Sequence, residues 1–157
     1  MNHADHVALL ARGVTQGEGG TWADLGAGTG AFTLALAELR SAFVSAVPQA
    51  ELRARNADFT RRLDLSDLDG VVMANSLHFV DDKVAVLALV RGYLKHGGRL
   101  LLVEYDSDRA NDWVPHPLSF ETWRDVAAEA GFVETQKLAT VPSRFLRQIY
   151  SALSLAP

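Results

Sequence analysis

A carboxylate followed by glycines at alternate positions stands near the start of the chain, in the stretch TWADLGAGTGAF, Thr21–Phe32. Glycines permit a tight turn and carry no side chain, so the backbone can approach a ligand closely. The N–H groups of the helix that follows would then face that ligand. With Ala31 in the third-glycine place, GAGTGA also satisfies the loose dinucleotide fingerprint. The stretch therefore indicates a loop that binds a nucleotide-like ligand.

The charge of Asp24 favours some of the ligands that this loop could hold over others. It stands two residues before Gly26, where a pyrophosphate would approach, and two negative charges at that place would repel each other. A ligand with a positively charged amino end is favoured instead, and S-adenosylmethionine has such an end as well as a sulfonium. Asp24 therefore disfavours a nicotinamide-dependent reductase, which is kept as a third hypothesis.

Four side chains near predicted strand ends are candidates for a catalytic base: His78, Tyr105, Asp106 and His116. A group-transfer reaction needs a base only if the acceptor holds its proton at neutral pH. Structural roles compete with this one, because His78 could cap or line the sheet and polar residues are expected at strand ends. His116 lies between two prolines and, with Trp113, could form a lid over the substrate.

Several other chemistries have no support in the sequence. The chain has no cysteine, which excludes disulfides, thiolate metal sites and cysteine nucleophiles. No G-x-S-x-G elbow and no Walker-type Gly-Lys-Ser/Thr follow a strand. His3 and His6 are three residues apart but lack a fixed carboxylate partner, so we expect them to be solvated and predict no metal site.

Composition and charge predict one globular domain, residues 1–157, that acts on a small molecule. The 15 basic and 19 acidic residues give a formal net charge of -4, which argues against a nucleic-acid partner. We expect the small basic patch of Arg53, Arg55, Arg61 and Arg62 to be a solvated edge. The absence of a signal-peptide pattern and of a long apolar run predicts a soluble, cytoplasmic protein without a membrane partner.

Strands and helices are predicted to alternate along most of the chain. The expected helices are 4–13, one that starts at Gly28–Gly30, Asp81–Lys95 with Gly97 and Gly98 as its stop, and one capped by Ser119 that runs to Ala130. The expected strands are Thr21–Leu25, Leu68–Asn75, Arg99–Tyr105, and a closing hairpin of Phe132–Thr140 and Phe145–Leu153. This order predicts a doubly wound, mainly parallel α/β sheet with helices on both faces and a C-terminal antiparallel hairpin. Ligands bind such sheets beyond the carboxyl ends of the strands, where the glycine loop falls.

The sequence resembles the class I S-adenosylmethionine-dependent methyltransferases, and specifically their small-molecule group. The segments that carry the resemblance are ADLGAGTG at Ala23–Gly30, NADF at Asn56–Phe59, VVMANSLHFV at Val71–Val80, YLKHGGRLLLVEY at Tyr93–Tyr105, and SFETWRDVAAEAGF before the hairpin. The resemblance implies a Rossmann-like methyltransferase fold, S-adenosyl-L-methionine as the cofactor, and methyl transfer to an oxygen, nitrogen or carbon of a small molecule.

The same resemblance implies roles for individual residues. Gly26, Ala27 and Gly28 would face the cofactor through their backbones, and Asp24 would orient its amino-acid end. Asp58 would accept a hydrogen bond from the adenine amino group, with Phe59 beside the ring. Asn75, Ser76 and Leu77 would lie under the central part of the cofactor. His78, Tyr105 and His116 stay the catalytic candidates.

One family feature has no counterpart in this sequence. The second strand of the family ends in an acid that binds the ribose hydroxyls, and here Pro48 and Gln49 occupy that region. Either SAFVSAV, Ser41–Val47, is the second strand with Glu51 as a displaced substitute, or PQAELRARNADF is the third strand and the second is deleted. We favour the deletion. A homodimer could cover the resulting sheet edge, and a non-catalytic or degenerate cofactor-binding dimer is the alternative function.

Overall fold

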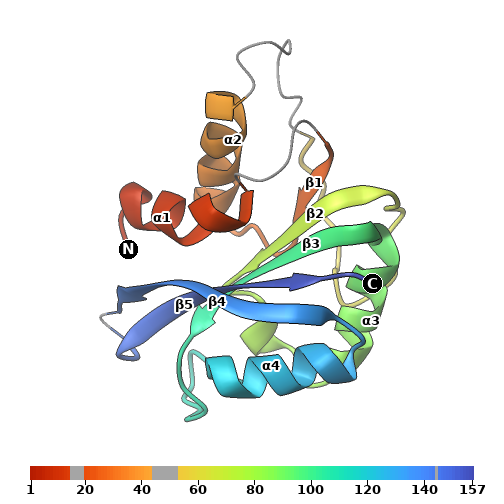
Figure 1. The fold of residues 1–157 in the computed structure, drawn as a ribbon. Helices are drawn as coiled ribbons and strands as arrows, with labels where there is room; N and C mark the ends of the chain where they lie inside the picture. Colours follow the sequence, from red (N-terminus) through yellow and green to blue (C-terminus); the bar gives the residue numbers. More distant parts are fainter. Residues whose placement is uncertain (15–19, 44–52, 144) are drawn as a thin grey trace.

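Five strands form one mixed sheet in the computed structural model, which describes residues 1–14, 20–43, 53–143 and 145–157 (Figure 1). The strands are β1 (Trp22–Asp24), β2 (Leu68–Ala74), β3 (Leu94–Tyr105), β4 (Val133–Pro142) and β5 (Gln148–Leu155). Their order in the sheet is β1-β2-β3-β5-β4. The first three are parallel, β5 is antiparallel to β3, and β4 is antiparallel to β5. The predicted parallel sheet with a C-terminal hairpin is therefore confirmed.

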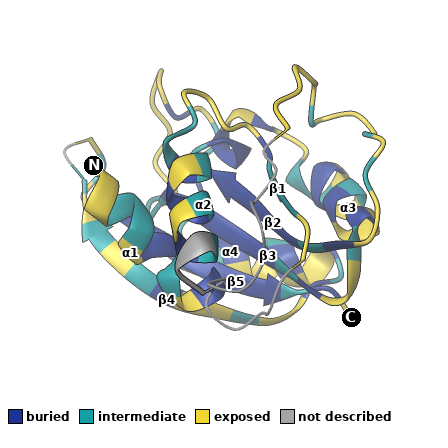
Figure 2. Ribbon diagram, turned by 90° about the horizontal axis from the view of Figure 1, so that it is seen from above, coloured by how far each residue is buried: buried dark blue, intermediate teal, exposed yellow. Residues whose placement is uncertain are grey.

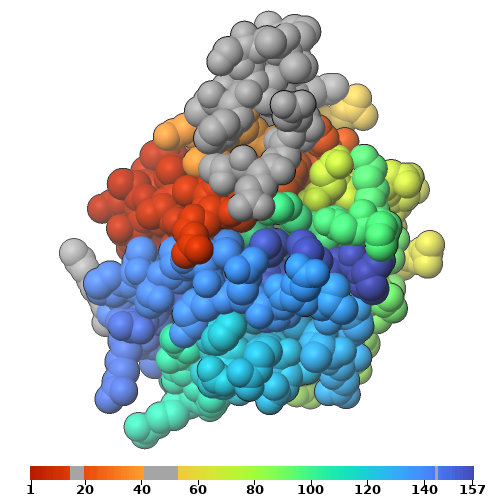
Figure 3. Space-filling view, in the orientation of Figure 1, coloured from red at the N-terminus to blue at the C-terminus, as the bar shows by residue number. Residues whose placement is uncertain are grey.

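Helices cover both faces of this sheet, as predicted. The helices α1 (His3–Val14) and α2 (Ala31–Phe43) lie on one face, and α3 (Lys83–Tyr93) and α4 (Phe120–Glu129) lie on the other (Figure 1). A short 3₁₀ helix, η1 (Leu77–Phe79), follows β2. On one side of the molecule, the hairpin and α4 form a continuous surface below α1 (Figure 3).

Two apolar cores result, one on each face, and the side chains of β2 divide between them. Val71 and Met73 pack in the core beneath α3 and α4, whereas Val72 and Ala74 pack in the core beneath α1 and α2. Strands buried on both faces are expected to be continuously apolar rather than alternating. This explains the unbroken apolar runs that revealed β2 and β3 in the sequence. The strand β2 is buried along most of its length and β3 along its second half (Figure 2).

The two ends of α4 form as the sequence predicts. The Ser119 side chain accepts a hydrogen bond from Thr122 N at 3.3 Å, which satisfies one of the free N–H groups in the first turn. Gly131 follows the last turn with φ +85°, a left-handed conformation that glycine adopts without steric cost. Both ends of this helix are therefore fixed by local chemistry.

The expected glycine stop of α3 is wrong. The helix ends at Tyr93, and residues 95–98 belong to β3. The pairing of β3 with β2 jumps from Leu68↔Leu94 to Gly70↔Arg99, so these residues form an irregularity within the strand. Gly97, at φ +73°, donates its N–H to Ala156 O at 2.9 Å, and the hydrogen bond between the two chain segments holds the irregularity in the sheet.

The structure also corrects the proposed third strand. Residues 53–58 of PQAELRARNADF have no strand structure and are exposed, Phe59 lies in a turn, and residues 48–52 lie outside the described residues. Ser41–Phe43 end α2, so SAFVSAV does not begin as a strand. Pro48, Gln49 and Glu51 lie outside the described residues, and the homodimer stays a prediction. Within the described ranges, no helix combines the length and hydropathy needed to cross a bilayer.

The two-sided core makes a first prediction about stability. Leu87 on α3 is fully buried, so Leu87→Ala should lower the free energy of unfolding by about 2–5 kcal/mol, because it removes buried methyl groups and leaves a cavity. Leu34 on α2 is 62% exposed, so Leu34→Ala should change the free energy of unfolding by less than about 0.5 kcal/mol. Urea denaturation measures both. Equal effects of the two substitutions would contradict the assigned burial.

Candidate active site

The glycine loop joins β1 to α2 at the carboxyl edge of the parallel strands. Gly26, Gly28 and Gly30 have φ values of +79°, +54° and +83°, which residues with a side chain rarely adopt. Leu25 N donates to Val72 O at 2.9 Å and so continues the β1–β2 pairing up to the loop. The pattern of alternate glycines therefore reflects three left-handed backbone positions at every second residue of the loop.

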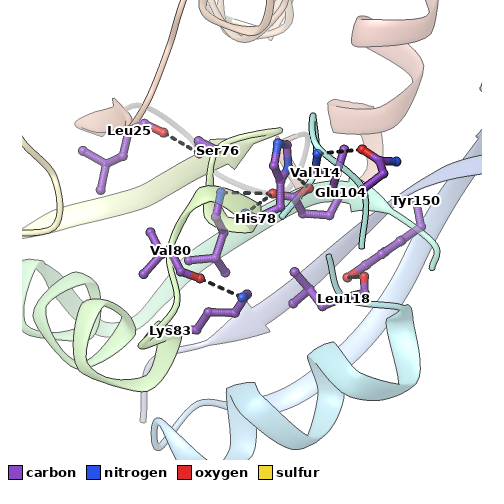
Figure 4. A network of polar contacts seen from close by, with 11 residues as sticks. Leu25, Ser76, His78, Val80, Lys83, Glu104, Val114, Leu118 and Tyr150 are labelled. Carbon is purple, nitrogen blue, oxygen red and sulfur yellow. Dashed lines mark hydrogen bonds and ion pairs between the residues drawn. The ribbon is translucent and has the colours of Figure 1, made fainter. Parts of the chain in front are cut away.

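The first glycine of the loop is required by packing inside the protein. A Cβ on Gly26 would lie 2.5 Å from Ser76 Cβ and 3.2 Å from Phe59 Cε1. Ser76 is buried, and its hydroxyl donates to Leu25 O at 3.0 Å (Figure 4). The segments that follow β1 and β2 are thus held against each other through Gly26.

The other two glycines face open space. A Cβ on Gly28 would have Gly26 O at 4.0 Å as its nearest neighbour, and a Cβ on Gly30 would meet no atom within 4 Å. Residues 26–29 are exposed. The bare backbone on this side is therefore open to solvent, and its contact with a ligand stays a prediction.

Asp24 lies at the end of β1 with one carboxylate oxygen bonded and one unpartnered. Thr33 Oγ1, on α2, donates to Asp24 Oδ2 at 2.6 Å. Asp24 Oδ1 is buried and has no hydrogen-bond partner in the described part of the chain. Burial raises the pKa of Asp24, and the Thr33 bond opposes that shift. An outside donor, above all a cation, would satisfy the free oxygen.

Asn75, directly after β2, presents a second unpartnered oxygen. Its backbone has φ +50°, and its N–H donates to Val103 O at 2.8 Å. Asn75 Oδ1 is buried without a partner among the described residues. Two neighbouring strands therefore end in buried acceptors that lack a donor, and the remaining such atoms in the described residues belong to Trp123 and Ser151.

The segment expected near the adenine ring is only partly arranged for that role. Phe59 lies beside Gly26, as the packing of the loop shows. Asp58 is exposed, and its Oδ1 accepts from Thr60 N at 3.0 Å and from Thr60 Oγ1 at 2.6 Å. These bonds with Thr60 lower the pKa of Asp58. The structure thus brings Phe59 to the loop, whereas Asp58 is engaged in a local turn.

A buried carboxylate organises the residues after Asn75. Glu104 Oε1 accepts from Leu77 N at 3.0 Å and from His78 N at 3.1 Å. Glu104 Oε2 lies 2.7 Å from His78 Nδ1 (Figure 4). Glu104 is fully buried and His78 is 3% exposed. His78 therefore does line the sheet, and it does so through an ion-pair geometry that holds its ring in one orientation.

The remaining catalytic candidates differ in their surroundings. Tyr105 is half-buried with its ring 5.9 Å from that of His78, and burial, followed by the charge of Glu104, raises the pKa of its phenol. His116 donates its backbone N–H to His78 O at 3.0 Å, and its half-exposed ring lies 3.6 Å from Asp81 Oδ1. Trp113 is 82% exposed, and its role in a lid stays a prediction.

Asp106 has a structural function. Its Oδ1 accepts from Phe120 N at the start of α4, and its Oδ2 lies 2.9 Å from Lys137 Nζ. Both oxygens are occupied, so this carboxylate ties α4 and β4 to the end of β3 instead of serving as a free base.

The two N-terminal histidines pack against α2. His3 Nε2 lies 2.7 Å from Glu38 Oε2, and the His6 ring lies 4.6 Å from that of Phe32. The expectation that both are solvated is therefore wrong for His6, whose pKa is lowered by burial. No cluster of three metal-ligating side chains occurs in the described ranges.

Sequence reasoning did not single out Glu104 or Thr33. A charged residue in the apolar run LLLVEY was the available signal for Glu104, because a buried charge requires partners. Thr33 gave no signal, since its contact with Asp24 depends on how α2 packs beside β1.

Comparison with known proteins agrees with this geometry. A family model described as a methyltransferase domain matches residues 23–102, which is more than half of the chain. The chain belongs to the S-adenosylmethionine-dependent methyltransferase family. S-adenosylmethionine is the cofactor of this family, and the matched range includes the glycine loop, Asp58, Asn75 and η1. A search of curated proteins found no match.

Several solved structures share the fold of this family member at low sequence identity. An S-adenosylmethionine-dependent methyltransferase from Thermotoga maritima is 17% identical, with TM-score 0.73 and coverage of 99% of this chain and 89% of that one. The YcgJ protein from Bacillus subtilis is 13% identical, with TM-score 0.74 and 98% of both chains covered. A 1,6-didemethyltoxoflavin-N1-methyltransferase from Burkholderia thailandensis, with bound S-adenosylhomocysteine, is 16% identical, with TM-score 0.73 and coverage of 98% and 77%. Against two further structures, the chain spans 49% and 56% of the other protein's length.

The two kinds of glycine in the loop predict different effects of the same substitution. Gly26→Ala should lower the free energy of unfolding by about 1–3 kcal/mol more than Gly28→Ala, because only the Cβ at position 26 would overlap Ser76. Both sites have positive φ, so the backbone cost of alanine is common to the pair. Urea denaturation without ligand measures the difference. A smaller effect at Gly26 than at Gly28 would contradict the close packing.

Proposed function

We propose that the chain binds S-adenosylmethionine at the glycine loop and transfers its methyl group to a small molecule. The observation that carries the proposal is the pair of buried, unpartnered oxygens, Asp24 Oδ1 and Asn75 Oδ1, at the ends of adjacent strands. Buried polar atoms are normally hydrogen-bonded, so these acceptors fit a ligand that brings N–H donors. The ammonium of the amino-acid end of S-adenosylmethionine is such a group, and its charge suits Asp24.

The residues around this pair fit the rest of the cofactor. The backbones of Gly26, Ala27 and Gly28 would lie against it, since the exposed loop carries no side chain larger than a methyl group there. Phe59, beside Gly26, is placed to contact the adenine ring. Asp58 would have to exchange its bonds with Thr60 for one to the adenine amino group.

Ser76 and Leu77 would form the floor under the central part of the cofactor. Both are buried and held by hydrogen bonds, Ser76 to Leu25 O and Leu77 N to Glu104. A floor that is already fixed loses little entropy when the ligand binds.

The bound cofactor supplies a methyl group that its sulfonium has already activated. The chain's task is then to position an acceptor, exclude water and take up a proton where the acceptor carries one. His78, Tyr105 and His116 are the side chains proposed for this region, and the backbone bond from His116 to His78 brings the loop before α4 to the end of β2. The small-molecule acceptor is supported by the toxoflavin-type neighbour, whose own substrate is a small molecule.

Removal of the charge at Asp24 tests the cofactor site. Asp24→Asn should weaken S-adenosylmethionine binding at least tenfold, about 1.4 kcal/mol, because the ammonium loses its counter-charge. Asp125→Asn, at an exposed site on α4, is the matched control and should leave binding unchanged. Isothermal titration measures both proteins. Equal affinities of the two variants would remove Asp24 from the site.

The same titration with the unmodified protein separates the three functions. Binding of S-adenosylmethionine or S-adenosylhomocysteine supports the proposal. Tighter binding of a nicotinamide dinucleotide would support a reductase, and a folded protein that binds neither would support the degenerate, non-catalytic alternative.

Asp24 should also make the stability of the unliganded protein depend on pH. Its pKa is raised by burial, so the folded state holds the proton more tightly than the unfolded state. Stability therefore falls as the pH rises from the ordinary value of 3.8 through the raised pKa of the folded state. Without ligand, Asp24→Asn should unfold at higher urea than the wild type at pH 7, and the advantage should shrink as the pH falls towards 4. An advantage that is the same at both pH values would contradict the assigned burial.

A further inference from the structure

The stretch that brings Phe59 to the glycine loop belongs to no helix or strand. Residues 53–67 lie between α2 and β2 in the described part of the chain and form turns and irregular structure. Neither a sheet ladder nor a helix therefore fixes the backbone of this stretch. The contact of Phe59 with Gly26 has to be maintained by other interactions.

Apolar side chains supply part of that anchoring. Phe59, Leu63 and Leu65 are partly buried and pack against the core beneath α3 and α4. Apolar burial is favourable but has no preferred direction. These contacts hold the stretch against the core, whereas its exact position requires an interaction with defined geometry, such as a hydrogen bond.

One hydrogen bond joins residues 54–66 to another part of the described chain. Leu63 N donates to the hydroxyl oxygen of Tyr93 at 2.7 Å. Tyr93 is the last residue of α3, and it is 3% exposed among the apolar side chains of the same core. Phenylalanine could fill this place without a polar atom, whereas a buried tyrosine hydroxyl needs a partner. The Tyr93 hydroxyl therefore fixes the backbone at Leu63.

A closed turn connects Leu63 to Phe59. Arg61 N donates to Asp58 O at 3.1 Å, and Thr60 donates to Asp58 Oδ1 through its N–H at 3.0 Å and through its hydroxyl at 2.6 Å. These three bonds make the turn a unit. A shift of the backbone at Leu63 would therefore move Phe59 relative to the glycine loop.

We propose that Tyr93 is a positioning residue for the cofactor, which holds Phe59 against the adenine ring through the bond to Leu63 N. The inference rests on the proposed function, because it requires the adenine of S-adenosylmethionine at Phe59. It divides the site into two halves. The amino-acid end would meet Asp24 and Asn75 at the ends of β1 and β2, whereas the adenine end depends on the last residue of α3.

The amino-acid half of the site is held by other interactions. The strands β1 and β2 are paired up to Asp24↔Val72, and the Asp24 side chain is bonded to Thr33 on α2. Substitutions at sites that share no partner usually have additive effects, whereas residues that act through one another do not. Tyr93 should therefore be coupled to Phe59 in cofactor binding and independent of Asp24.

Double-mutant cycles test this division, with the affinity for S-adenosylhomocysteine measured by isothermal titration. Tyr93→Phe removes only the hydroxyl group and should weaken binding about threefold to tenfold, because the stretch loses its hydrogen bond to the core. In a Phe59→Ala background the same substitution should change the affinity by less than about twofold. In an Asp24→Asn background it should keep its full effect.

Tyr150→Phe is the matched control. Tyr150 is also a buried tyrosine, and its hydroxyl donates to Leu118 O at 3.3 Å instead of to the stretch that carries Phe59. This variant should bind S-adenosylhomocysteine within about twofold of the wild type. An equal loss of affinity in Tyr150→Phe and Tyr93→Phe would show a general effect of destabilisation and overturn the proposal.

Two further results would overturn it: unchanged affinity in Tyr93→Phe, or the full effect of this substitution in the Phe59→Ala background. If Tyr93→Phe does not fold by circular dichroism, amide hydrogen exchange of the wild type decides. The Leu63 N–H should be protected, and more strongly so with S-adenosylhomocysteine bound, whereas an exchange rate that does not change on binding would overturn the role of Tyr93.

The same titrations distinguish this failure from failure of the proposed function. A folded wild type that binds no S-adenosylhomocysteine would overturn both. Binding by the wild type with additive effects of Tyr93→Phe and Phe59→Ala would overturn only the positioning role of Tyr93 and leave the cofactor site in place.

Discussion

The arrangement of the carboxyl edge of the parallel strands depends on one buried carboxylate. Glu104 lies in β3 where no water can solvate it, and burial of an unpaired charge is strongly unfavourable. The segment after β2 supplies all the partners, two backbone N–H groups and an imidazole. As a result, η1 has a fixed position at the end of β2, although its sequence alone contains no strong helix signal. The floor of the proposed cofactor site is therefore set from the neighbouring strand.

Asp24 is the opposite case at the same edge of the sheet. One of its oxygens is bonded to Thr33, and the other is buried without a donor. A structural carboxylate would have both oxygens satisfied, as Asp106 does at the start of α4. This difference in hydrogen bonding distinguishes Asp106, which holds elements of the fold together, from Asp24, for which a ligand contact is proposed. The two residues are of the same type, so the proposal rests on their hydrogen bonds and not on their identity.

The three glycines of the loop meet two different requirements, close packing inside the protein and a bare backbone towards open space. Gly26 is needed because another segment of the protein packs against it, whereas Gly28 and Gly30 leave the backbone bare towards open space. Close internal packing at the first glycine fixes the loop, and the bare backbone beyond it is the surface proposed to bind the cofactor. The packing and the positive φ values together explain why glycine stands at all three positions, which a simple turn would not require.

The sequence by itself determined the architecture and singled out the loop at which the cofactor site is proposed. The apolar runs of β2 and β3, the cap at Ser119 and the hairpin were predictable because each depends on local propensity or on burial of both faces. The pattern at Asp24 and Gly26 located the loop for the same reason. Gly97 and Gly98 were misread, since a glycine pair that can end a helix can equally form an irregularity in a strand. Only the tertiary structure decided which acids are satisfied, which glycine is packed and which histidine is buried against an acid. Those properties arise from contacts such as His78 to Glu104, between residues 26 positions apart, and no local pattern encodes them.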